Sequence, residues 1–265
     1  MKTLTTLLAA AALAAASTAV QAANVLVVLS DANHLELKDG KVYPTGFYLN
    51  ELTQPVRMLM EAGHTITFAT PKGNAPTLDQ NSVDAMYFKG DAAALKANLA
   101  FLDKLGLTSA HKSPVVSLSR VEQAGYERYD AVFIPGGHAP MQDLISSPQL
   151  GKLLASFHQA GKPTALVCHG PAALLSAKSG TAKWIYDGYR MTVISNQEEE
   201  LSKAALKGGE MKLLPQTGLE QAGGKYSSNT TPWTAHVVTD RELITGQNPA
   251  SALQVGQTLL ARLKK

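Results

Sequence analysis

Short apolar runs alternate with helix-spaced segments along this chain, and this alternation restricts the fold more than any other feature. Residues 24–30 read NVLVVLS, residues 46–62 place Leu, Val and Met at helical spacing, and residues 64–70 read HTITFAT. A continuous run rich in Val and Leu is typical of a strand buried on both faces of a parallel sheet. The three segments therefore predict a βαβ unit with a right-handed crossover.

The same alternation returns later in the chain and predicts the remaining elements. Strands are expected at residues 129–134, 163–167 and 190–194, helices at residues 91–105, 149–159, 170–178 and 249–263, and extended segments at residues 113–121, 235–238 and 242–245. No repeat or linker interrupts residues 23–265, so we predict one α/β domain with insertions, a doubly wound and mostly parallel sheet sandwiched by helices. Its ligand crevice is expected beyond the carboxyl ends of the strands.

The first 22 residues, MKTLTTLLAAAALAAASTAVQA, have the layout of a secretory signal peptide. One Lys precedes a Leu/Ala run, and small residues stand at a cleavage position after Ala22. A membrane anchor is the alternative, but the apolar run is shorter than the roughly 20 residues that cross a bilayer. We therefore expect a periplasmic or secreted protein without stable membrane insertion once the signal peptide 1–22 is cleaved.

Charge and cysteine content exclude several classes of protein. The 24 Lys and Arg nearly balance the 21 Asp and Glu, so the sequence implies no nucleic-acid partner. A single cysteine, Cys168, excludes an intramolecular disulfide framework and a Cys-rich zinc site. The remaining scattered histidines lack metal-ligand spacing, and no metal is implied; these are His34, His64, His111, His158 and His236.

The lone cysteine stands where a predicted strand turns into a predicted helix. Residues 165–171 read ALVCHGP, so Cys168 lies on a tight strand-to-helix elbow that exposes its side chain at the crevice. The helix N-terminus beyond it is expected to lower the pKa of the thiol and favour the thiolate. The alternative is an inert core cysteine, which is what most free cysteines are.

A second turn, at residues 135–138, follows a strand expected to neighbour the Cys168 strand. Its sequence is Pro-Gly-Gly-His, and Gly136 and Gly137 allow backbone amides to approach a ligand closely. Together with His138 and the amide of His169, this turn is expected to form an oxyanion and substrate-binding site.

These motifs, with others spread over nearly the whole mature chain, carry a resemblance to a known family. They lie at residues 46–47, 51, 55, 62–63, 69–73, 129–131, 136–138, 168–171, 198–200 and 245–251. The chain resembles the ThiJ/PfpI family, whose class I glutamine amidotransferase-like fold is flavodoxin-like. It is most similar to the larger members known as glutathione-independent glyoxalases (glyoxalase III) and holding chaperones.

The resemblance assigns roles to individual residues. Cys168 matches the nucleophile and His169 its partner, while Glu51 matches the acidic residue that such proteins place against the thiol. A triad acid behind His169 matches the run 198–200, in which Glu199 aligns best. A one-residue shift at a helix start rotates a side chain by about 100°, so the run itself leaves the choice among its three glutamates open.

The activity that the resemblance implies is a glyoxalase III-like lyase that converts methylglyoxal, a small 2-oxoaldehyde, to lactate without glutathione. Neither a metal nor an organic cofactor is needed, because a thiol and an acid–base pair supply the chemistry. A cysteine amidase or peptidase with an open groove is one alternative, and an envelope stress chaperone with an oxidant-sensing thiol is another. Relatives often form homodimers, although no motif here fixes an interface.

Overall fold

The computed structural model describes residues 22–177 and 183–264. Residues 1–21 of the expected signal peptide lie outside the described residues. Among the described residues, no helix is both long enough and apolar enough to cross a membrane.

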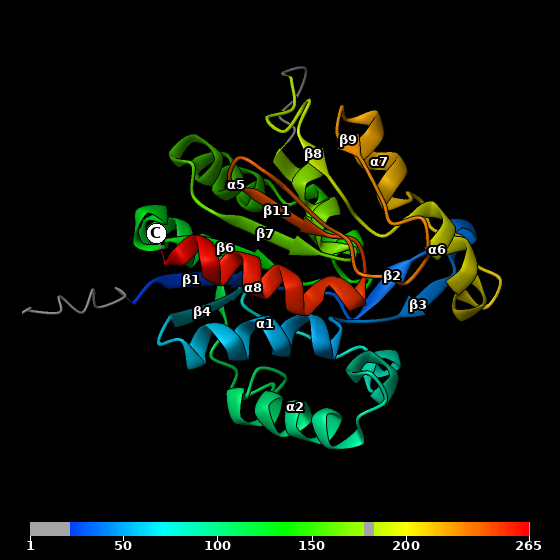
Figure 1. The fold of residues 1–265 in the computed structure, drawn as a ribbon, viewed down its shortest axis with the longest axis horizontal. Helices are drawn as coiled ribbons and strands as arrows, with labels where there is room; N and C mark the ends of the chain where they lie inside the picture. Colours follow the sequence, from blue (N-terminus) through cyan, green and yellow to red (C-terminus); the bar gives the residue numbers. More distant parts are fainter. Residues whose placement is uncertain (1–21, 178–182, 265) are drawn as a thin grey trace, which may run out of the picture.

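Seven strands form one sheet in the order β10-β11-β7-β6-β1-β4-β5 (Figure 1). Their bounds are β1 (Asn24–Val28), β4 (Thr65–Thr70), β5 (Val116–Ser117), β6 (Ala131–Ile134), β7 (Thr164–Val167), β10 (Val237–Asp240) and β11 (Leu243–Gly246). All neighbours pair in parallel except β10 and β11, which are antiparallel. Two small pairs lie apart from this sheet: β2 (His34–Glu36) with β3 (Val42–Pro44), and β8 (Arg190–Met191) with β9 (Lys225–Tyr226).

The helices cover both faces of the sheet, as the predicted doubly wound fold requires. The α-helices are α1 (Leu49–Glu61), α2 (Ala92–Leu105), α3 (Leu118–Ala124), α4 (Pro140–Asp143), α5 (Pro148–Ala160), α6 (Asn196–Ser202), α7 (Pro215–Gln221) and α8 (Ala252–Leu263). The 3₁₀ helices are η1 (Lys38–Gly40), η2 (Gln80–Ser82), η3 (Ala85–Phe88), η4 (Tyr126–Arg128), η5 (Leu144–Ser146), η6 (Gly170–Ala177), η7 (Lys203–Leu206) and η8 (Pro249–Ser251). Helices α1 and α8 pack together on one face, and α5 packs with η6 on the other (Figure 1).

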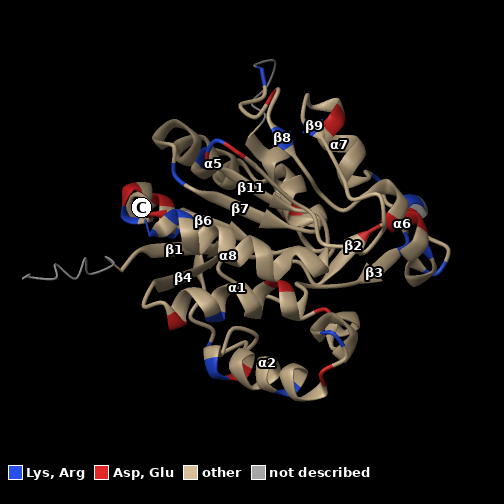
Figure 2. Ribbon diagram, in the orientation of Figure 1, with Lys and Arg blue, Asp and Glu red and all other residues tan. Residues whose placement is uncertain are grey.

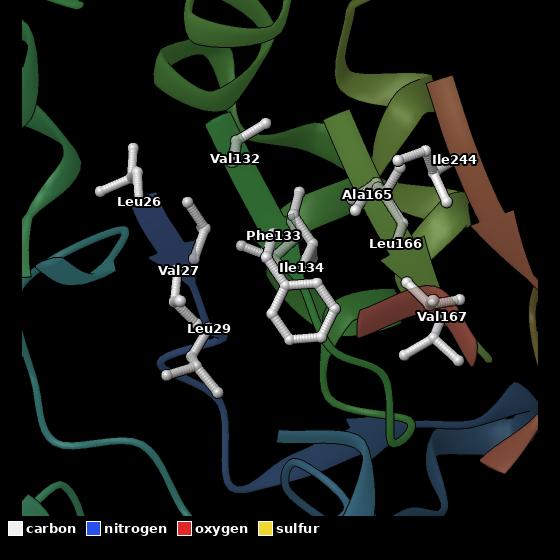
Figure 3. Packing of buried hydrophobic residues seen from close by; sticks show 14 of the residues in the cluster. Leu26, Val27, Leu29, Val132, Phe133, Ile134, Ala165, Leu166, Val167 and Ile244 are labelled. Atoms are coloured by element: carbon white, nitrogen blue, oxygen red, sulfur yellow. The ribbon is translucent and has the colours of Figure 1, made fainter. Parts of the chain in front are cut away.

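The core lies between the sheet and these helices. Strands β1, β6, β7 and β11 contain no charged residue, and side chains such as Val27, Phe133, Leu166 and Ile244 are fully buried (Figure 3). Val27 is paired in register with Phe133, which is paired in turn with Ala165 on β7. Lys, Arg, Asp and Glu are interspersed over the outer helices and loops (Figure 2). The apolar runs therefore became strands buried on both faces.

Three predicted elements differ from the structure. In residues 113–121 only Val116–Ser117 is a strand, because Ser117 caps α3 by accepting a hydrogen bond from the Arg120 amide at 3.1 Å. The element after Cys168 is the 3₁₀ helix η6, and residue 178 lies outside the described residues.

The predicted strand at residues 190–194 was also wrong, since only Arg190–Met191 is extended and it pairs with β9 outside the main sheet. Beyond Met191 the backbone amides bond elsewhere. Thr192 donates to the Thr245 hydroxyl at 2.9 Å, and Ile194 donates to the Cys168 carbonyl at 3.1 Å. This segment therefore ties the Cys168 turn to β11 instead of extending a ladder.

Candidate active site

Cys168 lies at the carboxyl end of β7 with a left-handed backbone, φ +61°. Its amide donates to the Gly246 carbonyl at 2.9 Å, and its carbonyl accepts from the Ile194 amide at 3.1 Å. A left-handed conformation in a residue other than glycine costs about 1–3 kcal/mol and persists where the surrounding structure imposes it. The two hydrogen bonds hold the predicted elbow in this conformation, but Cys168 itself is buried, with 3% exposure.

His169 connects the cysteine to a buried carboxylate. Its Nδ1 lies 3.3 Å from the Cys168 Sγ, and its Nε2 lies 2.8 Å from Oε1 of Glu199 on α6. Burial acts to raise the pKa of Glu199, but the charge and hydrogen bond of His169 outweigh it, so the pKa of Glu199 is lowered overall. A carboxylate in this position orients the imidazole and stabilises its protonated form.

The structure distinguishes the three consecutive glutamates. Glu199 is 6% exposed and faces His169, whereas the Glu200 side chain is 73% exposed and pairs with Lys203 at 3.4 Å. Glu198 is fully buried and forms a capping box with Ser195 at the start of α6. The alignment chosen from the resemblance thus matches the geometry.

Glu198 is a site residue that the sequence reasoning did not single out. Its carboxylate accepts hydrogen bonds from the Ser195 amide and hydroxyl, the Trp233 amide, the Gln247 amide group and the Asn248 amide group, at 2.7 to 3.0 Å. A helix was expected to begin at residue 249, and Asn248 does cap η8, which begins at Pro249. The hydrogen bond that the Asn248 side chain donates to Glu198 could not be predicted from the sequence.

Glu51 reaches the cysteine from the first turn of α1. It is fully buried, and its Oε2 accepts a hydrogen bond from the Gly136 amide at 2.8 Å. Burial raises the pKa of Glu51 to about 8, an effect that the Cys168 sulfur and the Gly136 amide partly offset. The carboxyl is therefore mostly protonated at neutral pH, and its Oε1 has no hydrogen-bond partner among the described residues.

The thiol itself contradicts one expectation. Burial first, and then the charge of Glu51, raise the pKa of Cys168, whereas a helix N-terminus was expected to lower it. The helix that follows is a 3₁₀ helix of eight residues, and its dipole does not outweigh desolvation. The resting group is therefore a thiol, and a neighbouring base must remove its proton before attack.

The turn at Gly136 and Gly137 brings α1 against the elbow. A Cβ atom on Gly136 would stand 2.6 Å from Glu51 Oε2 and 2.7 Å from the Cys168 Cβ, so only glycine fits. The Gly136 amide donates its hydrogen bond to Glu51. It was expected to face a substrate oxyanion, and that expectation was wrong. Gly137, at φ +80°, packs on the Gly46 backbone. Its amide is a further small effect that partly offsets the rise in the pKa of Glu51 caused by burial.

His138, the last residue of this turn, is stacked near the candidate triad. Its ring centroid lies 4.0 Å from that of His169, and its Nε2 lies 3.9 Å from Oε2 of Glu199. Burial, followed by the charge of His169, lowers the pKa of His138 to about 3. Its Nδ1 has no hydrogen-bond partner within the described part of the chain. His138 is therefore a neutral imidazole at the edge of the reacting centre.

The described residues contain one group suited in spacing to a metal ion. One ligand atom each from His138, His169 and Glu199 lie within 4.8 Å of one another. The His169 Nε2 and a Glu199 oxygen are already hydrogen-bonded at 2.8 Å. A hydrogen-bonded imidazole and carboxylate are also the arrangement of an acid–base pair.

Above Cys168 and the two histidines opens a cavity of about 1030 Å³. Tyr43, Tyr48 and Tyr87 form part of its wall, and Lys89 is the one Lys, Arg, Asp or Glu among the described residues that line it. Cavities of this size hold drug-sized molecules. The cavity lies at the carboxyl ends of the strands, where the crevice was expected.

A mostly parallel sheet flanked by helices, with a cysteine on a strained elbow after a central strand, defines a flavodoxin-like protein of the class I glutamine amidotransferase-like type. The sequence model of the DJ-1/PfpI family matches residues 42–262. The chain belongs to the DJ-1/PfpI family, and the resemblance stated from its motifs is confirmed.

Individual relatives agree with this assignment. A protein/nucleic acid deglycase HchA of Staphylococcus aureus is 28% identical over 235 residues, covering 88% of this chain and 77% of the relative. The crystal structure of the rapid encystment protein of Francisella tularensis is 27% identical, with a TM-score of 0.75 over 91% of this chain and 99% of that one. Glyoxalase III of Candida albicans, at 24% identity, shares the fold with a TM-score of 0.71 over 90% of this chain and 96% of that one.

Proposed function

We propose that this chain is a glutathione-independent glyoxalase or deglycase that acts on methylglyoxal and related 2-oxoaldehydes through Cys168. The observation that carries the proposal is the line from Cys168 through His169 to Glu199, with the fully buried Glu51 beside the sulfur. A relative that is 28% identical over most of the chain and is named a deglycase supports the reaction class.

In the proposed reaction, the thiol proton of Cys168 passes to Nδ1 of His169 as the sulfur adds to the aldehyde carbon. The proton then moves from His169 to the new oxygen, which leaves a neutral hemithioacetal. Glu199 stabilises the imidazolium that forms in between. Because the resting thiol has a raised pKa, this general-base step is required for attack.

Proton transfer across the two carbonyl carbons follows. His169 removes the proton from the former aldehyde carbon, while protonated Glu51 gives its proton to the neighbouring ketone oxygen, and an enediol results. Return of the His169 proton to the ketone carbon, and of a hydroxyl proton to Glu51, yields a lactoyl thioester on Cys168. Water then hydrolyses the thioester to lactate and regenerates the thiol.

The oxygen atoms need hydrogen-bond donors during these steps. Because the Gly136 amide is used by Glu51, we assign the donor role to the His169 amide and to the neutral ring of His138. A neutral imidazole is a suitable hydrogen-bond donor to an enediol oxygen, because its acidity is closer to that of the enediol than the acidity of a charged imidazolium is.

Purified protein incubated with methylglyoxal tests the proposal through the lactate formed. We expect lactate from the wild type and none above background from Cys168→Ala. Equal lactate from both proteins would overturn the proposal.

We further propose export, with residues 1–22 removed and the mature protein in the periplasm or medium. Mass spectrometry of the exported protein is expected to give a chain that begins at Ala23. An intact Met1 would contradict export by this route.

The open cavity also favours a second candidate. A three-carbon aldehyde fits a small closed pocket, whereas an amidase or peptidase, or a deglycase acting on carbonyl adducts carried by larger molecules, needs an open one. A methylglyoxal-modified peptide offered to the wild type and to Cys168→Ala distinguishes these: cysteine-dependent loss of the adduct indicates a deglycase, and cleavage of the peptide bond indicates a peptidase.

A further inference from the structure

Apolar side chains gather around the mouth of the cavity above Cys168. Six large hydrophobic residues among those described are exposed, and four of them, Met86, Leu201, Trp233 and Leu253, line this one cavity. They come from η3, α6, the loop before β10, and α8. Exposed apolar residues scattered singly need no explanation, but a cluster around a cavity indicates that something apolar binds there.

Trp233 holds a fixed position in this rim. Its backbone is left-handed, φ +64°, and the residue is 44% exposed. Its amide donates to Glu198 Oε1 at 2.7 Å, and Asn248 donates to the carbonyl of the next residue, Thr234, at 2.9 Å. Glu198 and Asn248 are fully buried. The backbone that carries this large aromatic side chain is thus fixed beforehand, which reduces the entropy that binding would otherwise cost.

The charge of the lining restricts the occupant. Of the described residues along the cavity, none is a carboxylate and one is a lysine, so the lining has no counter-charge for a cation. The two reacting carbons of a 2-oxoaldehyde are small beside a cavity of about 1030 Å³. A cationic substituent is therefore disfavoured, and the four exposed apolar residues at the mouth favour an apolar or aromatic one.

We propose that Trp233, held by Glu198, forms a subsite for a neutral apolar or aromatic substituent on the substrate, so that the preferred substrates are 2-oxoaldehydes or adducts bulkier than methylglyoxal. This inference rests on the proposed function and names its substrate class. Glu198 is a positioning residue in this arrangement, because it acts on the substrate through Trp233.

Steady-state kinetics with phenylglyoxal and methylglyoxal test the subsite. The wild type is expected to have the lower KM for phenylglyoxal. Trp233→Ala is expected to raise the KM for phenylglyoxal about ten-fold more than the KM for methylglyoxal, since one aromatic contact changes affinity by about that factor. Trp233→Phe is expected to restore most of the difference. Equal effects on both substrates, or no effect on either, would overturn the proposal.

Two further variants separate position from general damage. Met60→Ala removes a side chain of similar exposure, 42%, outside the cavity lining, and is expected to leave both KM values unchanged. Glu198→Gln is expected to give the same selective rise in the phenylglyoxal KM as Trp233→Ala. A fall in kcat for both substrates with no change in selectivity would show that Glu198 does not act through Trp233.

A binding measurement keeps the subsite testable even where no turnover is found. Saturation-transfer NMR with benzyl alcohol, on the Cys168→Ala protein, is expected to show a signal that is lost when Trp233→Ala is added. A signal that persists in the double variant would overturn the subsite. Sedimentation of the same proteins provides the other outcome: absence of benzyl alcohol binding, with a dimer that dissociates in Trp233→Ala, would mean that a second copy covers the rim.

Discussion

Glu199 and Glu200 are neighbours on α6, yet Glu199 is buried against His169 at 2.8 Å while Glu200 points into solvent and pairs with Lys203. The two side chains have the same chemistry and differ only in what they contact. They therefore form a matched pair for testing the role of the buried one.

Glu199→Gln is expected to lower kcat about 100-fold or more with little change in KM, because the imidazolium of His169 loses its charged partner during proton transfer. Glu200→Gln is the control and is expected to keep kcat within about two-fold, as surface substitutions usually do. Steady-state assays of lactate formation measure both. Similar losses in the two variants would show that the run of glutamates acts through overall charge.

Glu51→Gln is expected to lower the pKa of Cys168. Burial raises that pKa first and the Glu51 charge raises it further, so the neutral amide removes the second effect and leaves the first. At about pH 9 iodoacetamide alkylation is expected to be faster in the variant than in the wild type, because a larger fraction of the thiol is ionised. The reaction reports on one site, because the sequence contains a single cysteine. Glu200→Gln removes an exposed carboxylate and is expected to leave the alkylation rate unchanged; an equal rise there would refute the local effect.

The same variant is expected to stabilise the fold in a pH-dependent way. The pKa of Glu51 is about 8 in the folded chain against an ordinary 4.5, so the folded state keeps a proton that the unfolded state releases. Stability from this group is fully present below pH 4.5 and is lost as the pH rises toward 8, about 3 kcal/mol by pH 7. Urea unfolding at several pH values should show that the free energy of unfolding of Glu51→Gln increases relative to that of the wild type as the pH rises. A difference in free energy of unfolding between the two proteins that stays constant with pH would contradict this.

Gly136→Ala is expected to destabilise the protein by about 1–3 kcal/mol and to reduce activity, since the new methyl group overlaps Glu51 and Cys168. Gly161→Ala is the comparison: no atom lies within 4 Å of its new methyl group, and only its left-handed φ of +62° adds a cost, about 1 kcal/mol. Chemical denaturation and lactate assays measure the two effects. Retained activity in Gly136→Ala would show that the close approach of the turn is not needed.

The fold class was predictable because strands buried on both faces leave continuous apolar runs in the sequence. The same rule predicted a strand at residues 190–194, and there it was wrong. Met191, Val193 and Ile194 are buried as in a strand, but the amides of Thr192 and Ile194 bond to the Thr245 hydroxyl and the Cys168 carbonyl. An apolar run indicates burial, and it does not indicate which backbone groups pair.

The positions of Cys168 and His169 after their strand also followed from local pattern. The pKa of the thiol did not, because it depends on Glu51, which lies 117 residues earlier in the chain and meets the sulfur only in the folded sheet. The Gly136 amide likewise bonds to that carboxylate, so its role was misread from the turn alone. Long-range contacts of this kind leave no local sequence signal.

The two edge strands of the sheet, β5 and β10, affect how copies of the chain can associate. Strand β5 has two residues, and β10 is packed against β8, with Asp240 accepting a hydrogen bond from the Arg190 amide at 2.8 Å. Short or covered edges offer little free backbone for strand addition. Continuation of the sheet from one copy of the chain into the next is therefore disfavoured at both edges.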